Sequence, residues 1–128
     1  MTRDVIATPN APAAVGPYSQ GIKANGLVFV SGQLGLIPDT KQFAGGTVAE
    51  QTAQALKNVA AILAAAGTDM AHVVKVTVLL ADMGAFAEMN GVYQTFFASE
   101  PPARAAFAVK DLPLGGLVEI EAIAVMPG

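Results

Sequence analysis

The segment that most constrains the fold is the run from Val73 to Leu80, VVKVTVLL. Branched side chains fill it, which predicts a β-strand. Apolar residues fall on both of its faces, whereas a strand covered on one side alternates between apolar and polar positions. Helices can cover one face, and we expect another copy of the chain to cover the other. Only 13% of the residues are charged, about half the usual share in soluble proteins, and this also favours a homo-oligomer.

Other strands are predicted on both sides of this run. Residues 27–31 (LVFVS) form a short apolar strand that Gly32 is expected to end. Residues 18–23 precede it, and Asn25-Gly26 between the two is typical of a two-residue hairpin turn. Two further strands are expected after Pro101-Pro102, at residues 103–109 and 117–125.

Two helices are predicted between these strands. Thr47 and Glu50 match a capping box at the start of the first, and Gly67 is expected to end it. Asp82 is expected to cap the second, in which apolar residues recur at helical spacing: Phe86, Met89, Tyr93 and Phe96. The order of elements predicts one α+β domain over residues 1–128, with a sheet of about six strands and two helices on one face.

Composition excludes several classes of function. The chain has no cysteine, so disulfides, thiolate metal sites and cysteine nucleophiles are excluded. No apolar run approaches the roughly 20 residues that span a bilayer, and residues 1–17 lack the apolar core of a secretory signal. The seven basic residues are spread thinly and the net charge is −3, which argues against nucleic-acid binding. His72 is the single histidine and is expected at the surface, so we expect no metal site. The composition as a whole predicts a cytoplasmic protein without a membrane or nucleic-acid partner.

Three charged residues in apolar strands could carry chemistry. Arg104 is one of two arginines, and its planar guanidinium can bind a carboxylate through two hydrogen bonds; a structural salt bridge is the alternative. Glu119 and Glu121 share one face of the strand LVEIEAIAV because side chains alternate with a period of two. One of them could act as a base or hold a water molecule, and an exposed polar face is an equally good interpretation.

The ordered set of motifs resembles the RidA/YjgF family from about residue 5 to residue 126. The C-terminal part of the resemblance rests on Pro102-Ala103-Arg104, Leu112-Pro113 and Val118-Glu119-Ile120-Glu121. The rest is carried by these segments: Asn10-Ala11-Pro12, Gly16-Pro17-Tyr18, Ser31-Gly32-Gln33, Asn58-Val59, Val74 to Val78, Asn90 with Tyr93, and Phe96-Phe97. The resemblance implies a chorismate-mutase-like fold and a homotrimer with sites in the clefts between subunits. It also implies hydrolysis, without a cofactor, of 2-aminoacrylate and related enamines or imines to 2-keto acids and ammonia.

The family resemblance assigns roles to individual residues. Arg104 would hold the substrate carboxylate, and Glu119, rather than Glu121, would activate water. The cleft would be lined by Tyr18, Ser31, the Gly32 backbone and Asn90. Ala106 departs from the family, because many members carry a cysteine two residues after the arginine, so no role for a thiol is carried over.

Three other functions stay open at this point. Ribonuclease or translation-inhibitor activity is attributed to some members of the family, but the acidic chain and its lone histidine argue against it. A non-catalytic sensor of small carboxylates would use Arg104 in the same way as an enzyme, and only turnover separates the two. A chaperone-like surface would need no more than the high apolar content.

Overall fold

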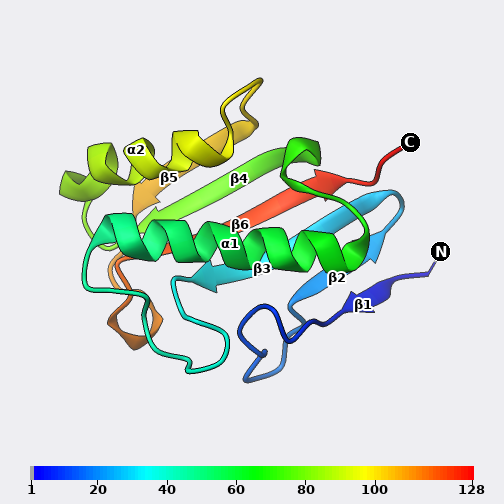
Figure 1. Ribbon diagram of the computed structural model, residues 1–128, viewed down its shortest axis with the longest axis horizontal. Helices are drawn as coiled ribbons and strands as arrows, with labels where there is room; N and C mark the ends of the chain where they lie inside the picture. The colour runs from blue at the N-terminus through cyan, green and yellow to red at the C-terminus, as the bar shows by residue number, and fades with distance from the viewer. Residues whose placement is uncertain (1) are drawn as a thin grey trace.

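The structure is a computed structural model that describes residues 2–128. Its main elements are β1 (Asp4–Ile6), β2 (Gly21–Ala24), β3 (Leu27–Leu34), α1 (Val48–Ala66), β4 (Val73–Leu80), α2 (Phe86–Phe96), β5 (Ala103–Ala108) and β6 (Val118–Val125). The strands form one sheet in the order β1-β2-β3-β6-β4-β5. Neighbouring strands are antiparallel except for the parallel pair β4 and β5. Both helices lie on the same face of the sheet, α1 over its middle and α2 over β4 and β5 (Figure 1). The predicted α+β domain of six strands and two helices is confirmed.

The hairpin between β2 and β3 forms at the predicted turn. Ala24 pairs with Leu27, and the two residues between them have positive φ angles, 53° at Asn25 and 76° at Gly26. The strand before the turn begins at Gly21, not at Tyr18 as predicted. Residues 18–20 instead belong to the preceding loop, because the Gln20 carboxamide binds the backbone of residues 8–12 through four hydrogen bonds of 2.7–3.2 Å.

The end of β3 corrects a second prediction. The strand does not stop at Gly32 but runs on to Leu34, and its pairing with β6 shifts register between Val30 and Gln33. A glycine inside a strand often marks such a bulge, where the backbone bends without ending the sheet. The three-residue β1 lies at the sheet edge beside β2 and has too few residues for an alternating pattern.

The helix ends follow local chemistry. The Thr47 hydroxyl accepts a hydrogen bond from the Glu50 amide at 3.1 Å, and the Glu50 carboxylate accepts one from the Thr47 amide at 3.3 Å, so the predicted capping box is confirmed. Gly67 ends α1 with a φ of 94°. Asp82 does not cap α2 directly; it accepts from the Gly84 amide and caps a 3₁₀ turn, Met83–Ala85, that leads into α2.

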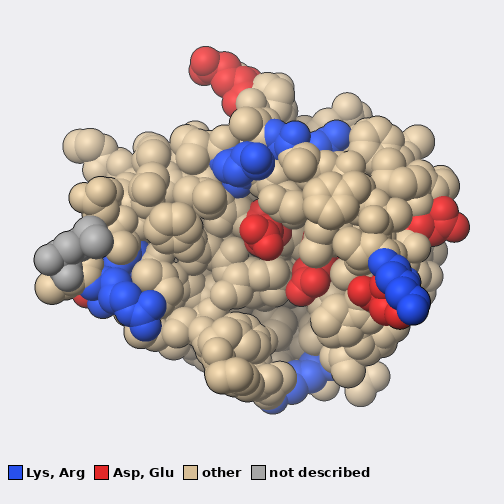
Figure 2. Space-filling view, turned by 180° about the vertical axis from the view of Figure 1, so that it is seen from behind, with Lys and Arg blue, Asp and Glu red and all other residues tan. Residues whose placement is uncertain are grey.

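The two faces of the sheet are covered unequally. On the helix side, the β4 residues Val76, Val78 and Leu80 are fully buried. On the other side, Val5, Phe29 and Phe107 are 41–61% exposed, although all three are large and apolar. Figure 2 shows this open side as a mostly uncharged surface with acidic side chains near its middle. Apolar residues therefore lie on both faces of the sheet, as the sequence of β4 predicts.

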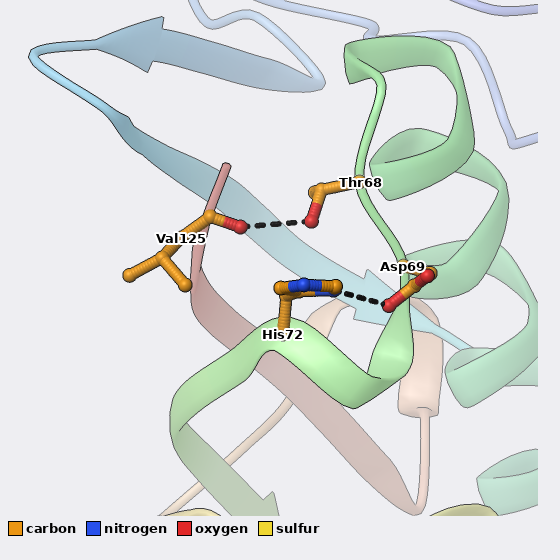
Figure 3. A network of polar contacts seen from close by, with 4 residues as sticks. All are labelled: Thr68, Asp69, His72 and Val125. Carbon is orange, nitrogen blue, oxygen red and sulfur yellow. Dashed lines mark hydrogen bonds and ion pairs between the residues drawn. The ribbon is translucent and has the colours of Figure 1, made fainter. Parts of the chain in front are cut away.

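The connection from α1 to β4 places His72 at the surface. The residue ends a 3₁₀ turn, Met70–His72, and its ring lies 2.7 Å from the Asp69 carboxylate (Figure 3). The hydrogen bond from His72 lowers the pKa of Asp69. Nearby, the Thr68 hydroxyl donates to the Val125 carbonyl at 2.8 Å and joins the turn to β6. The expected surface position of His72 is confirmed.

None of the helices within residues 2–128 is long and apolar enough to cross a membrane.

Candidate active site

Four of the predicted site residues line one cavity of about 500 Å³. These residues are Tyr18, Ser31, Gly32 and Glu119, and we call this space the Glu119 cavity. Its other walls are apolar apart from Gln33, and consist of Pro12, Ala13, Val15, Leu34, Leu36, Pro113 and Leu114. The loop before β2, the bulged part of β3, the turn before β6 and the start of β6 together build the cavity.

The bulge in β3 brings its backbone close to the Glu119 side chain. Glu119 pairs with Leu34 across the sheet, and the register shift lies just before this pair. A methyl group on Gly32 would stand 2.7 Å from Glu119 Oε2 and 3.0 Å from its Cδ, so the carboxylate can keep this position only beside a glycine. The adjacent Ser31 hydroxyl donates to the Ser19 carbonyl at 2.5 Å, which ties the Tyr18 loop to the same bulge.

The electrostatic environment of Glu119 favours the protonated carboxyl group more than water does. Burial of the side chain raises the pKa of Glu119, and the charge of Glu121 raises it further. The two glutamates face the same way because Glu119 pairs with Leu79 and Glu121 with Thr77, two residues apart on β4. A carboxylate with a raised pKa is a stronger base than an ordinary one, and its place beside a cavity suits it to accept a proton from water.

The other two predicted site residues form a separate group around Arg104. The Arg104 Nη1 donates a hydrogen bond of 2.7 Å to the Asn90 Oδ1 on α2. The guanidinium carbon lies 4.7 Å from the ring centre of Tyr93 and 5.5 Å from that of Phe86. A second cavity, of about 530 Å³, opens here, and we call it the Arg104 cavity. It is lined by Asn90, Tyr93, Gln94, Phe97, Pro101, Pro102 and Arg104.

Arg104 and Glu119 do not meet within one chain. Arg104 pairs with Val76 and so shares its helix-covered face of the sheet, whereas Glu119 pairs with Leu79 and points to the open face. Because β4 also separates their two strands, β5 and β6 are about 10 Å apart. The predicted site residues therefore fall into two groups on opposite faces, and a structural salt bridge between Arg104 and a glutamate of residues 2–128 is absent.

The aromatic neighbours of Arg104 could not be recognised from the apolar pattern of the sequence alone. The sequence assigns Phe86 only to the apolar rhythm of α2, and Tyr93 to that rhythm and to the family motif with Asn90, yet both rings contact the guanidinium. Their spacing relative to Asn90, four residues before and three after, is a signal that could have placed all three on the side of the helix that faces one cation. Within residues 2–128, no three His, Cys, Asp or Glu side chains are arranged to hold a metal ion.

Comparison with known proteins identifies the family. The chain matches the family model described as Endoribonuclease L-PSP over residues 8–126. It is 54% identical over 125 residues to the 2-iminobutanoate/2-iminopropanoate deaminase of Mus musculus, covering 98% of this chain and 93% of that protein. The chain belongs to the RidA/YjgF family. Among solved structures of similar proteins, the YjgF gene product of E. coli has a TM-score of 0.93 and is 42% identical, over 97% of this chain and 99% of the other. E. coli TdcF with bound serine also has a TM-score of 0.93, with 39% identity over 97% of this chain and 99% of the other.

Position 106 of this RidA/YjgF chain is an alanine, so no thiol is present there. Ala106 lies on β5 beside Val78 and therefore on the same face as Arg104, two residues away. Its side chain packs against the hydrophobic core. The methyl group supplies neither a proton nor a nucleophile, so the chemistry of the site has to come from the residues described above.

Proposed function

We propose that this protein hydrolyses 2-imino acids, formed from 2-aminoacrylate and related enamines, to 2-keto acids and ammonia. The reaction would take place in clefts between the copies of a homotrimer. One observation carries the proposal: the cation suited to bind a carboxylate and the carboxylate suited to activate water lie in separate cavities on opposite faces of the sheet. A substrate that contacts both groups needs Arg104 from one copy and Glu119 from another.

The Arg104 guanidinium is suited to anchor the substrate. Within residues 2–128 its one hydrogen bond uses Nη1, which leaves Nε and Nη2 free to hold a carboxylate through two parallel bonds. The similar protein with bound serine supports a ligand of this size, because serine carries a carboxylate on the carbon next to its amino group. A 2-imino acid has the same arrangement around its imine carbon.

The reaction then needs a positioned base. The Glu119 carboxylate accepts a proton from water while the water oxygen bonds to the imine carbon and the imine nitrogen takes up a proton. The proton that the imine nitrogen takes up is the one that Glu119 removes from water. In the resulting tetrahedral carbinolamine the hydroxyl proton passes through Glu119 to the amino nitrogen, the C–N bond breaks, and ammonia and the 2-keto acid are released. The imine carbon is already electrophilic, so anchoring and proton transfer are sufficient.

The open sheet face supports the proposed assembly. Large apolar side chains on this face stay exposed in one chain, and burial of apolar area is the main force in association. A trimer would cover them and would bring an Arg104 cavity of one copy toward a Glu119 cavity of the next. The proposal also includes a chorismate-mutase-like arrangement, which the family resemblance implies, and a cytoplasmic location, which a composition without cysteine favours.

A coupled assay tests the reaction. A serine dehydratase releases 2-aminoacrylate, and the appearance of pyruvate is followed with and without this protein. We expect the protein to speed up pyruvate formation well above spontaneous hydrolysis and Glu119→Gln to remove most of that effect. No acceleration by folded wild-type protein would contradict the enzyme and favour a sensor of small carboxylates.

Mixing two inactive variants tests the position of the site. Arg104→Ala and Glu119→Gln are unfolded together in equal amounts and refolded, so that trimers assemble at random. If each site takes Arg104 and Glu119 from different copies, every mixed trimer holds one intact site, and about a quarter of the wild-type activity returns. If both residues act within one chain, no activity returns. Light scattering on the same samples should give about three times the 13.0 kDa chain mass.

A further inference from the structure

One side of α2 forms a surface on which the Arg104 side chain rests. Phe86, Asn90 and Tyr93 are spaced by four and then three residues, so they lie in one row along the helix. We call these three residues the α2 platform. Arg104 reaches the platform because its strand position, beside Val76, directs its side chain to the helix-covered face of the sheet.

Each member of the platform restrains the guanidinium in a different way. The Asn90 carbonyl oxygen accepts from Nη1 at 2.7 Å and sets the rotation of the group in its own plane. The two rings lie within the roughly 6 Å at which a cation is attracted to an aromatic face, at 4.7 Å for Tyr93 and 5.5 Å for Phe86. Tyr93 is almost wholly buried, so water screens this attraction poorly.

We propose that Phe86 and Tyr93 are positioning residues that hold the Arg104 guanidinium in the orientation in which Nε and Nη2 face the substrate carboxylate. This inference rests on the proposed function, because it assigns the carboxylate to Arg104. An unrestrained arginine loses side-chain conformational freedom when it binds a ligand, and this loss costs free energy. A platform that restrains the side chain before the substrate arrives removes part of that cost, and the gain is measured as affinity.

The ring of Tyr93, rather than its hydroxyl group, makes the contact that matters. The Tyr93 hydroxyl is buried and has no hydrogen-bond partner within residues 2–128. Burial raises the pKa of Tyr93, and the nearby positive charge of Arg104 opposes that increase. The hydroxyl is therefore neutral and unpaired, and it can be removed without loss of the ring's attraction for the guanidinium.

The test compares two substitutions of Tyr93 in the assembled protein. The measurements are the Kd for 2-oxobutanoate, a stable 2-keto acid probe, from calorimetry, and kcat and KM from the coupled assay. Tyr93→Leu keeps an apolar side chain and loses the aromatic face, and should weaken binding and raise KM by about 3- to 30-fold. Tyr93→Phe keeps the face and should bind like the wild type, with a higher Tm because an unpaired buried hydroxyl is gone.

Phe96→Leu is the matched control. It also replaces an aromatic residue of α2 by leucine, but Phe96 does not line the Arg104 cavity or contact the guanidinium. It should lower stability and leave the Kd unchanged. If Tyr93→Leu does not assemble, Phe86→Leu at the half-buried member of the platform replaces it, with a smaller expected loss of affinity because its ring is farther from the cation.

Three results would overturn the platform alone. The first is wild-type affinity for 2-oxobutanoate in folded Tyr93→Leu, or in Phe86→Leu where that variant replaces it. The second is a loss of affinity in Tyr93→Phe as large as that in Tyr93→Leu. The third is a loss of affinity in the control Phe96→Leu as large as that in Tyr93→Leu. In each case loss of probe binding by Arg104→Ala would leave the proposed function standing. Wild-type binding and turnover in folded Arg104→Ala would instead overturn the proposed function itself, so the two failures are distinguishable.

Discussion

Replacing Gly32 by alanine should move the Glu119 carboxylate without disturbing the fold. The new methyl group would stand 2.7 Å from Glu119 Oε2, whereas an ordinary contact of this kind begins near 3.4 Å. The oxygen must therefore retreat by about 0.7 Å. Misplacement of a reacting group by about 1 Å can lower a rate by a hundredfold, so we expect kcat to fall by about 10- to 100-fold.

The stability of the Gly32→Ala variant should change by less than about 1 kcal/mol. Gly32 does not have a positive φ, so alanine fits its backbone conformation. The atoms that clash belong to the end of a flexible side chain, which can rotate away at low cost. The binding of a 2-keto acid should persist, because the carboxylate anchor on Arg104 lies in the other cavity.

The assay measures kcat, 2-oxobutanoate affinity and the urea unfolding midpoint on one preparation. Gly46→Ala is the control, because a methyl group there meets nothing within 4 Å. The decisive comparison introduces Gly32→Ala into Glu119→Gln, where the base is already lost and little further loss of kcat is expected. Full turnover in Gly32→Ala, or an equal loss in the Glu119→Gln background, would refute the reasoning.

Four further predictions concern the site and the start of α1. Arg104→Lys should lower kcat/KM by about 10- to 100-fold, because an ammonium keeps the charge but loses the planar pair of donors; steady-state kinetics on folded protein check this. Activity should fall as pH drops through the raised pKa of Glu119, and Glu121→Gln, which removes the neighbouring charge, should move this acidic limb of the kcat/KM profile to lower pH. The same raised pKa makes Glu119 stabilise the folded state at pH values below the ordinary glutamate pKa. This stabilisation is lost as pH rises through the folded-state pKa of Glu119, and urea unfolding at a series of pH values would detect the loss. Thr47→Ala removes the capping box and should lower the free energy of unfolding by about 1 kcal/mol at unchanged activity per folded protein.

The parts of the fold that local chemistry determines could be predicted from the sequence. The Asn25-Gly26 turn and the ends of α1 at Thr47 and Gly67 follow from residues adjacent in the chain, and the structure has them where they were expected. The continuation of β3 past Gly32 was not predicted, because a bulge depends on the strand that pairs with it. The start of β2 lies later than predicted for a similar reason, since Gln20 is bound to the backbone of Thr8, Ala11 and Pro12 in the preceding loop.

The candidate site, like the fold, could be predicted from the sequence only in part. The family motifs named Tyr18, Ser31, Gly32 and Glu119, and the structure brings these four to one cavity. The motifs also named Asn90 with Arg104, and these two share a hydrogen bond. Linear motifs carry no information about which sheet face a residue occupies relative to a distant strand, so the separation of Arg104 from Glu119 becomes visible only from the strand order and register.

The two glutamates also limit how another copy can cover the open sheet face. Glu119 and Glu121 share the open face, which Figure 2 shows as mostly uncharged, and burying an unpaired carboxylate costs several kcal/mol. A partner can therefore pack closely on Phe29 and Phe107 but has to leave water or a positive charge beside the glutamates. The proposed cleft satisfies this requirement, because the Arg104 of the neighbouring copy brings a positive charge to the same space. Its approach would oppose the effect of burial on the Glu119 pKa and would favour the ionised carboxylate that the proposed hydrolysis needs.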